Sequence, residues 1–371
     1  MRHTFVFIEV FGCEGGIQSY IQDVLGAYDK IAPKYQATAD VFLLRDPEMA
    51  HPLKSGALKY HYFKSARPWV ERVRLSCSLL VNLLFHRPDH VFCGHINLAT
   101  LVKVSCQLLG IPYTVLTYGK EVWYELPQTE KRALRAADSV WTISRYSRDL
   151  ACAANQVSPD KFEMLPCVVD GSIFTPGPKP VDLIDRYQLQ SSKVLMTVAR
   201  LWPGDIYKGV DVTIRALPEI AQTFPTVKYV VIGRGDDQPR LAKLAEELGV
   251  AERVIFAGFV PDEALVAHYQ LADVYVMPSK EGFGIVYLEA MACGVPVIAG
   301  DDDGSADPVQ DGRLGWQVPH RDPVAVATAC IEALSGEDAR CDGTWLRSQT
   351  LDKFSAPALV SKVNELISKQ C

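Results

Sequence analysis

The chain has 371 residues, of which 48% are hydrophobic and 22% charged, and its formal net charge is −6. At about 150 residues per domain, this length predicts two domains, each large enough to bury its own core. The composition is that of an ordinary globular protein, which excludes disordered and collagen-like chains. The acidic balance argues against nucleic acid as a partner, and no apolar run reaches the ~18 residues that a membrane-spanning helix needs.

Ten cysteines are spread over the chain, and no two of them have C-x-x-C spacing. Most lie within apolar runs, as reduced thiols of a cytosolic protein do, so we expect neither a disulfide framework nor a zinc site. Near the N-terminus, Glu9 interrupts the short apolar run Thr4–Ile8. This run therefore predicts a first strand and not a signal peptide.

Short apolar runs alternate with helical stretches of ~10–15 residues along most of the chain. The strands expected in the first half are Phe5–Ile8, Ala39–Leu44, His90–Cys93, Tyr113–Thr117 and Ser139–Ile143. Those expected in the second half are Val194–Val198, Lys228–Ile232, Arg253–Ala257, Val274–Met277 and Val295–Ala299. This alternation predicts an α/β protein with parallel sheets in βαβ units, covered by helices on both faces.

The alternation stops once, at Thr175–Pro180, where three prolines and a glycine fall within six residues. Such a segment predicts a stiff linker. We therefore expect an N-terminal domain over 1–175, a C-terminal domain over 176–350, and a final amphipathic helix within 351–371. Residues 1–180 have a net charge of +3 and the remainder −9, so the first domain is the basic one.

A basic segment lies between Lys54 and Arg74, with six Lys or Arg residues against the single acid Glu71 and with aromatic residues between them. Such a mixture can bind an anionic membrane surface, and the alternative is a solvated loop and helix face. The apolar segment Leu75–Phe85 that follows is too short to span a bilayer and predicts a core helix.

The segment Pro278–Ile298 has the strongest chemical signal of the chain. It predicts a loop after a strand, in which Gly282 and Gly284 allow the backbone to approach a ligand closely. A helix then begins near Gly284, and the free N–H groups at its start make an anion site. Glu281 and Glu289 flank that helix start, where their carboxylates can accept hydrogen bonds from sugar hydroxyl groups.

The two glutamates, separated by seven residues within EGFGIVYLEAMACGVPVIA, resemble the signature of the family 4 (group 1) retaining glycosyltransferases. This resemblance implies the GT-B fold, in which two Rossmann-like domains face each other across a cleft and the last helix crosses back to the first domain. It also implies that Glu281 meets the donor sugar and that Glu289 binds the nucleotide ribose. The backbone amides expected to contact the sugar or diphosphate are those of Gly282, Phe283, Gly284 and Ile285.

The segment that contains Arg200 and Lys208 is similar to a family segment in which a strand is followed by Arg-Leu, a loop and the motif K-G-x-D. Arg200 follows a predicted strand and Lys208 precedes a helix. The resemblance implies that both stabilise the leaving diphosphate, so that no metal or other cofactor is expected. Further donor contacts implied by weaker matches are Gly233, in a strand-to-turn G-x-G, and Phe259 and Val260, in a loop near the base. The segment Asp301–Ala306 departs from the family's Gly-Gly-x-Pro-Glu.

In the first half, Gly15 and Gly16 resemble the family's N-terminal glycine loop, where Gly16 would approach the diphosphate. Tyr118 stands where the family more often has histidine near the donor sugar. A tyrosine there can form a hydrogen bond but cannot act as a base at neutral pH, because its pKa is about 10. We assign Tyr118 to the catalytic set and His95 and Glu121 to the acceptor side, with a purely structural role for His95 equally open.

The resemblance implies a hexosyltransferase that uses a nucleoside-diphosphate sugar of the UDP-glucose or GDP-mannose type and forms an α-glycosidic bond with retention. The expected acceptor is a saccharide or a lipid-linked molecule, in polysaccharide or glycolipid synthesis. The alternatives are a catalytically silent nucleotide-sugar binding protein and a sugar-nucleotide epimerase of the same fold, although the spacing of Glu281 and Glu289 argues against the epimerase. The expected location is the cytoplasm, with Lys54–Arg74 as a peripheral contact to the inner face of the membrane.

Overall fold

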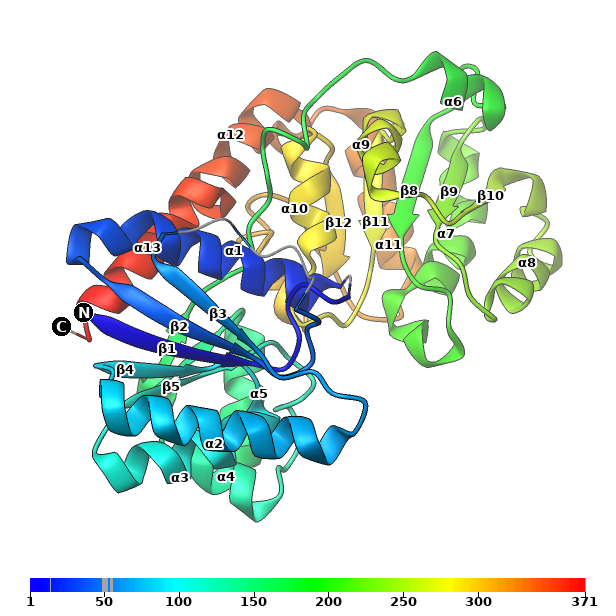
Figure 1. Ribbon diagram of the computed structural model, residues 1–371. Coiled ribbons are helices and arrows are strands. Elements are labelled where there is room, and N and C mark those ends of the chain that lie inside the picture. The colour runs from blue at the N-terminus through cyan, green and yellow to red at the C-terminus, as the bar shows by residue number, and fades with distance from the viewer. Residues whose placement is uncertain (14, 49–52, 54–55, 371) are drawn as a thin grey trace. The chain divides into compact units, whose positions relative to one another are not determined.

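The computed structural model describes residues 1–13, 15–48, 53 and 56–370 (Figure 1). Contacts divide the chain into two units, of which the first comprises Met1–Val168 and Ala356–Cys371 and the second Val169–Ser355. The domain limits expected from the sequence fall nearby, at 175/176 and 350/351. Each unit contains a parallel sheet with helices on its faces, which confirms the predicted α/β class and the two Rossmann-like folds.

The sheet of the first unit has the strand order β3-β2-β1-β4-β5-β6-β7. Its strands are β1 (Arg2–Phe7), β2 (Thr38–Leu43), β3 (Leu58–Tyr62), β4 (His90–Cys93), β5 (Tyr113–Thr117), β6 (Ser139–Thr142) and β7 (Phe162–Met164). The helices are α1 (Gly16–Ile31), α2 (Pro68–His86), α3 (Ile96–Leu109), α4 (Gln128–Ala136), α5 (Arg145–Asn155) and α13 (Ala356–Ser368), with short 3₁₀ turns η1 (Ala32–Tyr35) and η2 (Pro159–Lys161). The pairings run parallel, and the central strands are buried along their whole length, as a sheet covered on both faces requires.

Helix α13 packs against α1 within this first unit (Figure 1). The buried side chains of α13 are Leu359, Val363, Leu366 and Ile367. Their spacing places them on one face of the helix, so α13 closes a part of the core that α1 alone would leave exposed. The last helix therefore belongs to the first unit, as the resemblance to the GT-B fold implied.

The sheet of the second unit has the order β10-β9-β8-β11-β12-β13. Its strands are β8 (Val194–Val198), β9 (Lys228–Ile232), β10 (Val254–Gly258), β11 (Val274–Met277), β12 (Val297–Gly300) and β13 (Trp316–Val318). The helices are α6 (Val181–Arg186), α7 (Val210–Thr223), α8 (Gln238–Glu247), α9 (Asp262–Leu271), α10 (Ile285–Ala292), α11 (Pro323–Ser335) and α12 (Gly343–Phe354). The 3₁₀ turns are η3 (Pro203–Lys208), η4 (Ala251–Arg253), η5 (Gly304–Ala306) and η6 (Ala339–Cys341).

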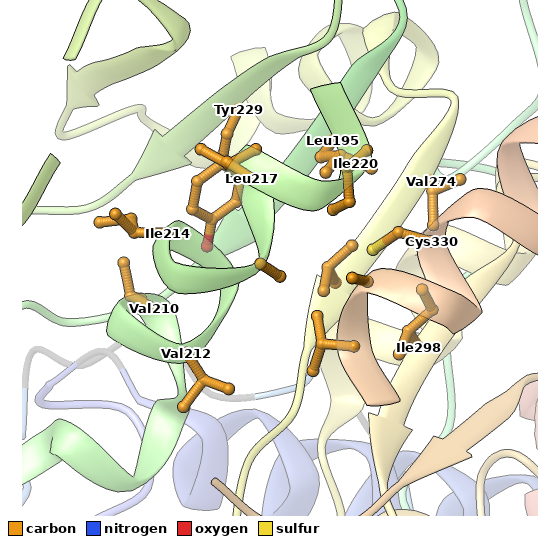
Figure 2. Close-up of a cluster of buried hydrophobic side chains, with 14 of the residues drawn as sticks. Leu195, Val210, Val212, Ile214, Leu217, Ile220, Tyr229, Val274, Ile298 and Cys330 are labelled. Carbon is orange, nitrogen blue, oxygen red and sulfur yellow. The ribbon is translucent and has the colours of Figure 1, made fainter. Parts of the chain in front are cut away.

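One core cluster of the second unit lies between the sheet and helices α7 and α11 (Figure 2). Leu195 and Val274 of adjacent strands contribute to it, together with Leu217 and Ile220 of α7 and Cys330 of α11, and all five are fully buried. Burial of a side chain of this size stabilises the fold by about 1.5–3 kcal/mol. This packing holds the strand ends in fixed positions, and the loops that follow those ends form the site described below.

Strands β3, β7 and β13 were not predicted, and helix α2 is less buried than expected. The interpretation of the basic segment as a loop and helix face is wrong for Leu58–Tyr62, which forms edge strand β3 beside β2. Lys54 lies outside the described residues. In α2 only one side is buried, with Leu75, Leu79 and Leu83, so the expected core helix Leu75–Phe85 in fact presents Phe85, 81% exposed, to solvent.

Candidate functional site

In both sheets the strand order reverses at a switch point, between β1 and β4 in the first unit and between β8 and β11 in the second. The loops that follow the two strands at such a point run to opposite sides, which leaves a crevice at the carboxyl ends of the strands where ligands bind. In the second unit these loops hold Arg200 and Lys208, after β8, and Glu281, after β11. The predicted cations and the first predicted glutamate thus lie at the same edge of one sheet.

The side chains of Lys208 and Glu281 form a direct ion pair, and both are largely buried. Their loops are also joined through the backbone, because the Lys280 N–H donates to the Tyr207 carbonyl at 3.0 Å. Gly209, with φ +75°, follows Lys208 and caps α7, and an added Cβ would lie 2.6 Å from the Pro278 carbonyl oxygen. The close fit of these two loops fixes the ammonium group beside the carboxylate.

Asp303 holds the backbone of Glu281 from a third loop. Its Oδ2 accepts the Glu281 N–H at 2.5 Å, and the Glu281 carbonyl accepts the Gly304 N–H at 2.8 Å. A Cβ added to Gly304 would lie 2.0 Å from the carbonyl oxygen of Gly282, so only glycine allows this approach. Asp303 is 4% exposed, and burial raises the pKa of its carboxyl to about 6. The sequence marked this segment only as a departure from the family pattern.

Helix α10 begins directly after the glycine-rich loop, with Gly284 as its N-cap. Gly284 has φ +88°, and a Cβ there would lie 2.4 Å from the ring of Tyr287, so this turn requires glycine. The ring of Phe283 is buried and packs edge-on against Phe354, with the centroids 6.0 Å apart. Phe283 can therefore offer a ligand only its backbone.

Glu289 lies in the second turn of α10, where it is largely enclosed. Its Oε2 accepts a hydrogen bond of 2.6 Å from the hydroxyl of Tyr269, on α9. Burial raises the pKa of the Glu289 carboxyl to about 7, and the tyrosine hydrogen bond opposes that shift. Tyr269 gave no sequence signal, because its contact with Glu289 depends on how two helices pack.

Arg200 does not contact Glu281. Its Nε lies 3.1 Å from an Asp205 carboxylate oxygen, and its guanidinium lies 5.6 Å from the ring of Trp202. The side chain is 65% exposed, which leaves it able to turn toward an anion at the strand edge. Arg200 thus supplies a cation that the Asp205 pair restrains only weakly.

The remaining donor candidates of the second unit lie after β9 and β10. Gly233 has φ +132°, and an added Cβ would lie 1.8 Å from the Ala199 carbonyl oxygen, so the turn tolerates no side chain. Phe259 is exposed, and the guanidinium of Arg234 lies 4.9 Å from its ring centre. Val260 is buried and can contribute only backbone groups.

In the first unit, the glycine loop Gly15–Gly16 is exposed, whereas Tyr118 is buried. Gly15 and Gly16 are exposed at the start of α1, and no atom lies within 4 Å of a Cβ built on Gly16. The Tyr118 hydroxyl instead donates to the Gly94 carbonyl at 2.6 Å, and burial raises the pKa of Tyr118 well above its usual value. In this conformation the hydroxyl is engaged in holding the loop after β4.

The two acceptor candidates also have local partners. The Asn97 N–H donates to Nδ1 of His95 at 3.1 Å, which caps α3, and desolvation lowers the pKa of His95. One Glu121 oxygen accepts the N–H groups of Tyr118 and Gly119, the latter at 3.2 Å. Both side chains therefore shape the loops at the carboxyl edge of this sheet.

A hollow of about 430 Å³ opens in the first unit between α2, α3 and the ends of β1 and β2. Apolar side chains such as Leu75 and Leu98 line it, together with the guanidinium-bearing residues Arg45 and Arg72. Arg72 belongs to the basic segment, whereas Arg45 lies outside it in sequence and gave no signal there.

A family model described as Glycosyl transferases group 1 matches residues 192–336, which include Arg200, Lys208, Glu281 and Glu289. A protein of Mycolicibacterium smegmatis is 37% identical over 382 residues, with 95% of each chain covered, and is named a GDP-mannose-dependent alpha-(1-6)-phosphatidylinositol monomannoside mannosyltransferase. The chain belongs to the group 1 glycosyltransferases.

Other similarities of this glycosyltransferase agree with the assignment. A D-inositol 3-phosphate glycosyltransferase of Acidothermus cellulolyticus is 34% identical over 61% of this chain and 55% of its own. Among solved structures, Anabaena Alr3699/HepE in complex with UDP matches with a TM-score of 0.79 at 19% identity, and all of both chains is covered. An apo lipopolysaccharide outer core galactosyltransferase, WaaB, matches with a TM-score of 0.76 at 20% identity, covering all of both chains. These structural likenesses show the GT-B fold.

Proposed function

We propose that this glycosyltransferase moves mannose from GDP-mannose, with retention, to a phosphatidylinositol mannoside or a closely related anionic glycolipid. The mannosyltransferase of M. smegmatis, similar over nearly its whole length, favours GDP-mannose over UDP-glucose and a lipid over a water-soluble acceptor. The structural observation that carries the proposal is the ion pair of Lys208 and Glu281 at the switch point of the second sheet.

The donor site is assembled from charges of both signs. Lys208, Arg200 and the free N–H groups at the start of α10 provide positive potential for the diphosphate. Glu281 meets hydroxyl groups of the hexose, and Glu289 accepts hydrogen bonds from the ribose. Ion pairing with Glu281 keeps the Lys208 ammonium in place before the donor arrives, so little reorganisation is needed when the diphosphate binds.

Retention follows from departure and attack on the same face of the sugar. As the bond from the anomeric carbon to the diphosphate breaks, the acceptor hydroxyl oxygen bonds to that carbon from the same side, and its proton passes to a leaving phosphate oxygen. Lys208 and Arg200 stabilise the charge that develops on the leaving group. This route needs no enzyme nucleophile and no base, in keeping with the hydroxyl of Tyr118, which is occupied by Gly94.

Helix α2 is the element that we assign to binding of the lipid acceptor. Trp69, Val73, Leu80 and Leu84 are exposed and spaced so that they share one face of the helix. Arginine residues flank that face, and the hollow beside it holds Arg45 and Arg72. Such a helix lies in the plane of an anionic bilayer, and the two guanidinium groups suit a lipid phosphate. Among the described residues, no helix is both long and apolar enough to cross the bilayer.

The test is a product assay in which GDP-mannose and UDP-glucose are each offered with phosphatidylinositol mannoside in vesicles and with water-soluble sugars. The expected product is a mannosylated lipid from GDP-mannose, with an α-anomeric configuration by NMR. Transfer only from UDP-glucose, or only to free sugars, would contradict the proposed substrates. Tight binding of donor without transfer or hydrolysis would instead indicate a silent binding protein.

A further inference from the structure

We propose that Asp303 is a positioning residue that sets the backbone of Glu281 for its contact with the donor sugar. This inference rests on the proposed function, because it assigns Glu281 to the sugar. It concerns the segment Asp301–Ala306, whose sequence departs from the pattern of the family.

The geometry joins the two loops by reciprocal hydrogen bonds. Asp303 Oδ2 accepts the Glu281 N–H at 2.5 Å, while the Glu281 carbonyl accepts the N–H of Gly304 at 2.8 Å. The peptide groups on both sides of the Glu281 Cα are thereby held by adjacent residues of one loop. The side chain of Glu281 can then vary only through its own torsions, and its ion pair with Lys208 restrains those.

The carboxylate is itself held in a single orientation. Its Oδ1 accepts the Ser305 N–H at 2.8 Å and the Ser305 hydroxyl, and its Oδ2 also lies 3.4 Å from the Ser279 hydroxyl. Within the part of the chain that the structure describes, the hydrogen bonds to the Asp303 carboxylate come from backbone N–H groups and serine hydroxyls, and none comes from a lysine or arginine. Both oxygens are acceptors here, which the ionised form provides and a side-chain amide cannot.

Burial of such a carboxylate is costly. Asp303 is 4% exposed, and burial raises the pKa of its carboxyl to about 6. A buried ionised group without a cation beside it is retained against a considerable desolvation penalty. The hydrogen bonds that Asp303 accepts from the Glu281 N–H and from Ser305 offset part of that penalty, and the first of them fixes the Glu281 peptide at the donor site.

The substitution Asp303→Asn keeps the shape of the side chain but turns one oxygen into an N–H₂ group, which faces either the Glu281 or the Ser305 N–H without bonding it. The control is Asp302→Asn, which makes the same charge change on the neighbouring side chain, 82% exposed. At pH 8, we expect Asp303→Asn to lower kcat for mannose transfer by tenfold or more, because small misplacements at a reacting centre are costly. The KM for GDP-mannose should change less than threefold, and Asp302→Asn should keep kcat within twofold of the wild type.

A second measurement does not depend on turnover. Amide hydrogen exchange over residues 279–284 should be faster in Asp303→Asn than in the wild type and in Asp302→Asn, while exchange in the core strands β8 and β11 stays unchanged. Equal protection of this loop in all three proteins would overturn the proposal, and so would a kcat of Asp303→Asn equal to that of the control. A wild type that transfers no sugar would overturn the proposed function instead, and the exchange data would still decide the role of Asp303.

Discussion

The hydroxyl of Tyr269, on α9, donates to the carboxyl of Glu289, on α10, with 2.6 Å between the oxygens. Burial raises the pKa of this carboxyl to about 7, although the tyrosine hydrogen bond favours its ionised form. The group proposed to receive the ribose hydroxyls therefore changes its charge near neutral pH. Donor binding and fold stability are thereby linked through one side chain.

Replacement of Glu289 by glutamine should alter stability in a pH-dependent way. The pKa is raised in the folded state, so folding is favoured most when the carboxyl is protonated, and wild-type stability is lost as pH rises from the unfolded value of 4.5 through about 7. The free energy of unfolding of Glu289→Gln should therefore increase relative to that of the wild type as the pH rises from 5 to 8.5. Urea unfolding measures it, with the exposed Glu263→Gln of α9 as control; a difference independent of pH would contradict the assignment.

Loss of either member of the pair Lys208 and Glu281 should abolish most turnover. We expect Lys208→Met and Glu281→Gln each to lower kcat by on the order of 10²–10³-fold, because each removes charge next to the developing transition state. Circular dichroism should show that both variants remain folded. Lys243→Met, on the exposed face of α8, serves as the control. If both site variants kept near-normal activity, the site assignment would be wrong.

A methyl group at Gly233 should disturb the donor edge of the second sheet. The added Cβ would lie 1.8 Å from the Ala199 carbonyl oxygen, so we expect Gly233→Ala to destabilise the fold by about 1–3 kcal/mol and to weaken nucleotide binding. Gly249→Ala is the matched control, because Gly249 also has a positive φ, +65°, but no atom within 4 Å of its Cβ. Equal effects of both substitutions on unfolding would show that the backbone angle matters and the close approach does not.

The exposed apolar face of α2 should bind vesicles. We expect Trp69→Glu and Leu84→Glu each to reduce partitioning onto phosphatidylinositol-containing vesicles by about tenfold, because each removes an apolar contact and adds a charge of the wrong sign. Sedimentation with vesicles measures this, and Val324→Glu provides an exposed apolar position in the second unit as control. Loss of vesicle binding in the control as well would point to a non-specific charge effect.

Acid should destabilise the first unit through two buried histidines. Burial lowers the pKa of His3 to about 4 and that of His90 to about 3. Below the unfolded value of 6.5, the unfolded chain takes up protons that the folded chain does not, so stability falls as pH drops from about 6.5 toward 4. Unfolding of His90→Gln should therefore depend less on pH over this range than that of the wild type. A variant of the exposed His86 should keep the full slope.

The sequence predicted best what is decided by local pattern. His90–Cys93 and Val194–Val198 were predicted with the bounds that the structure has, because strands buried on both faces are continuous apolar runs. Edge strand β3 was missed because Lys59 and His61 break its apolar pattern where one side faces solvent. In the site, the motifs predicted Glu281 and Lys208 separately. The contacts of Asp303 and Tyr269 could not be predicted, because they depend on how distant loops and helices meet.

The packing of α13 on α1 has a consequence for synthesis of the protein. Ribosomes make α13 only after the whole of Val169–Ser355, so the first unit waits for its last helix while the second unit can already fold. During translation, the apolar face of α1 that α13 later covers is exposed on a partly finished domain. Nascent chains that stall before Ala356 would present this surface to chaperones. Folding of the N-terminal unit is therefore complete only after the C-terminal residues of the chain have been synthesised.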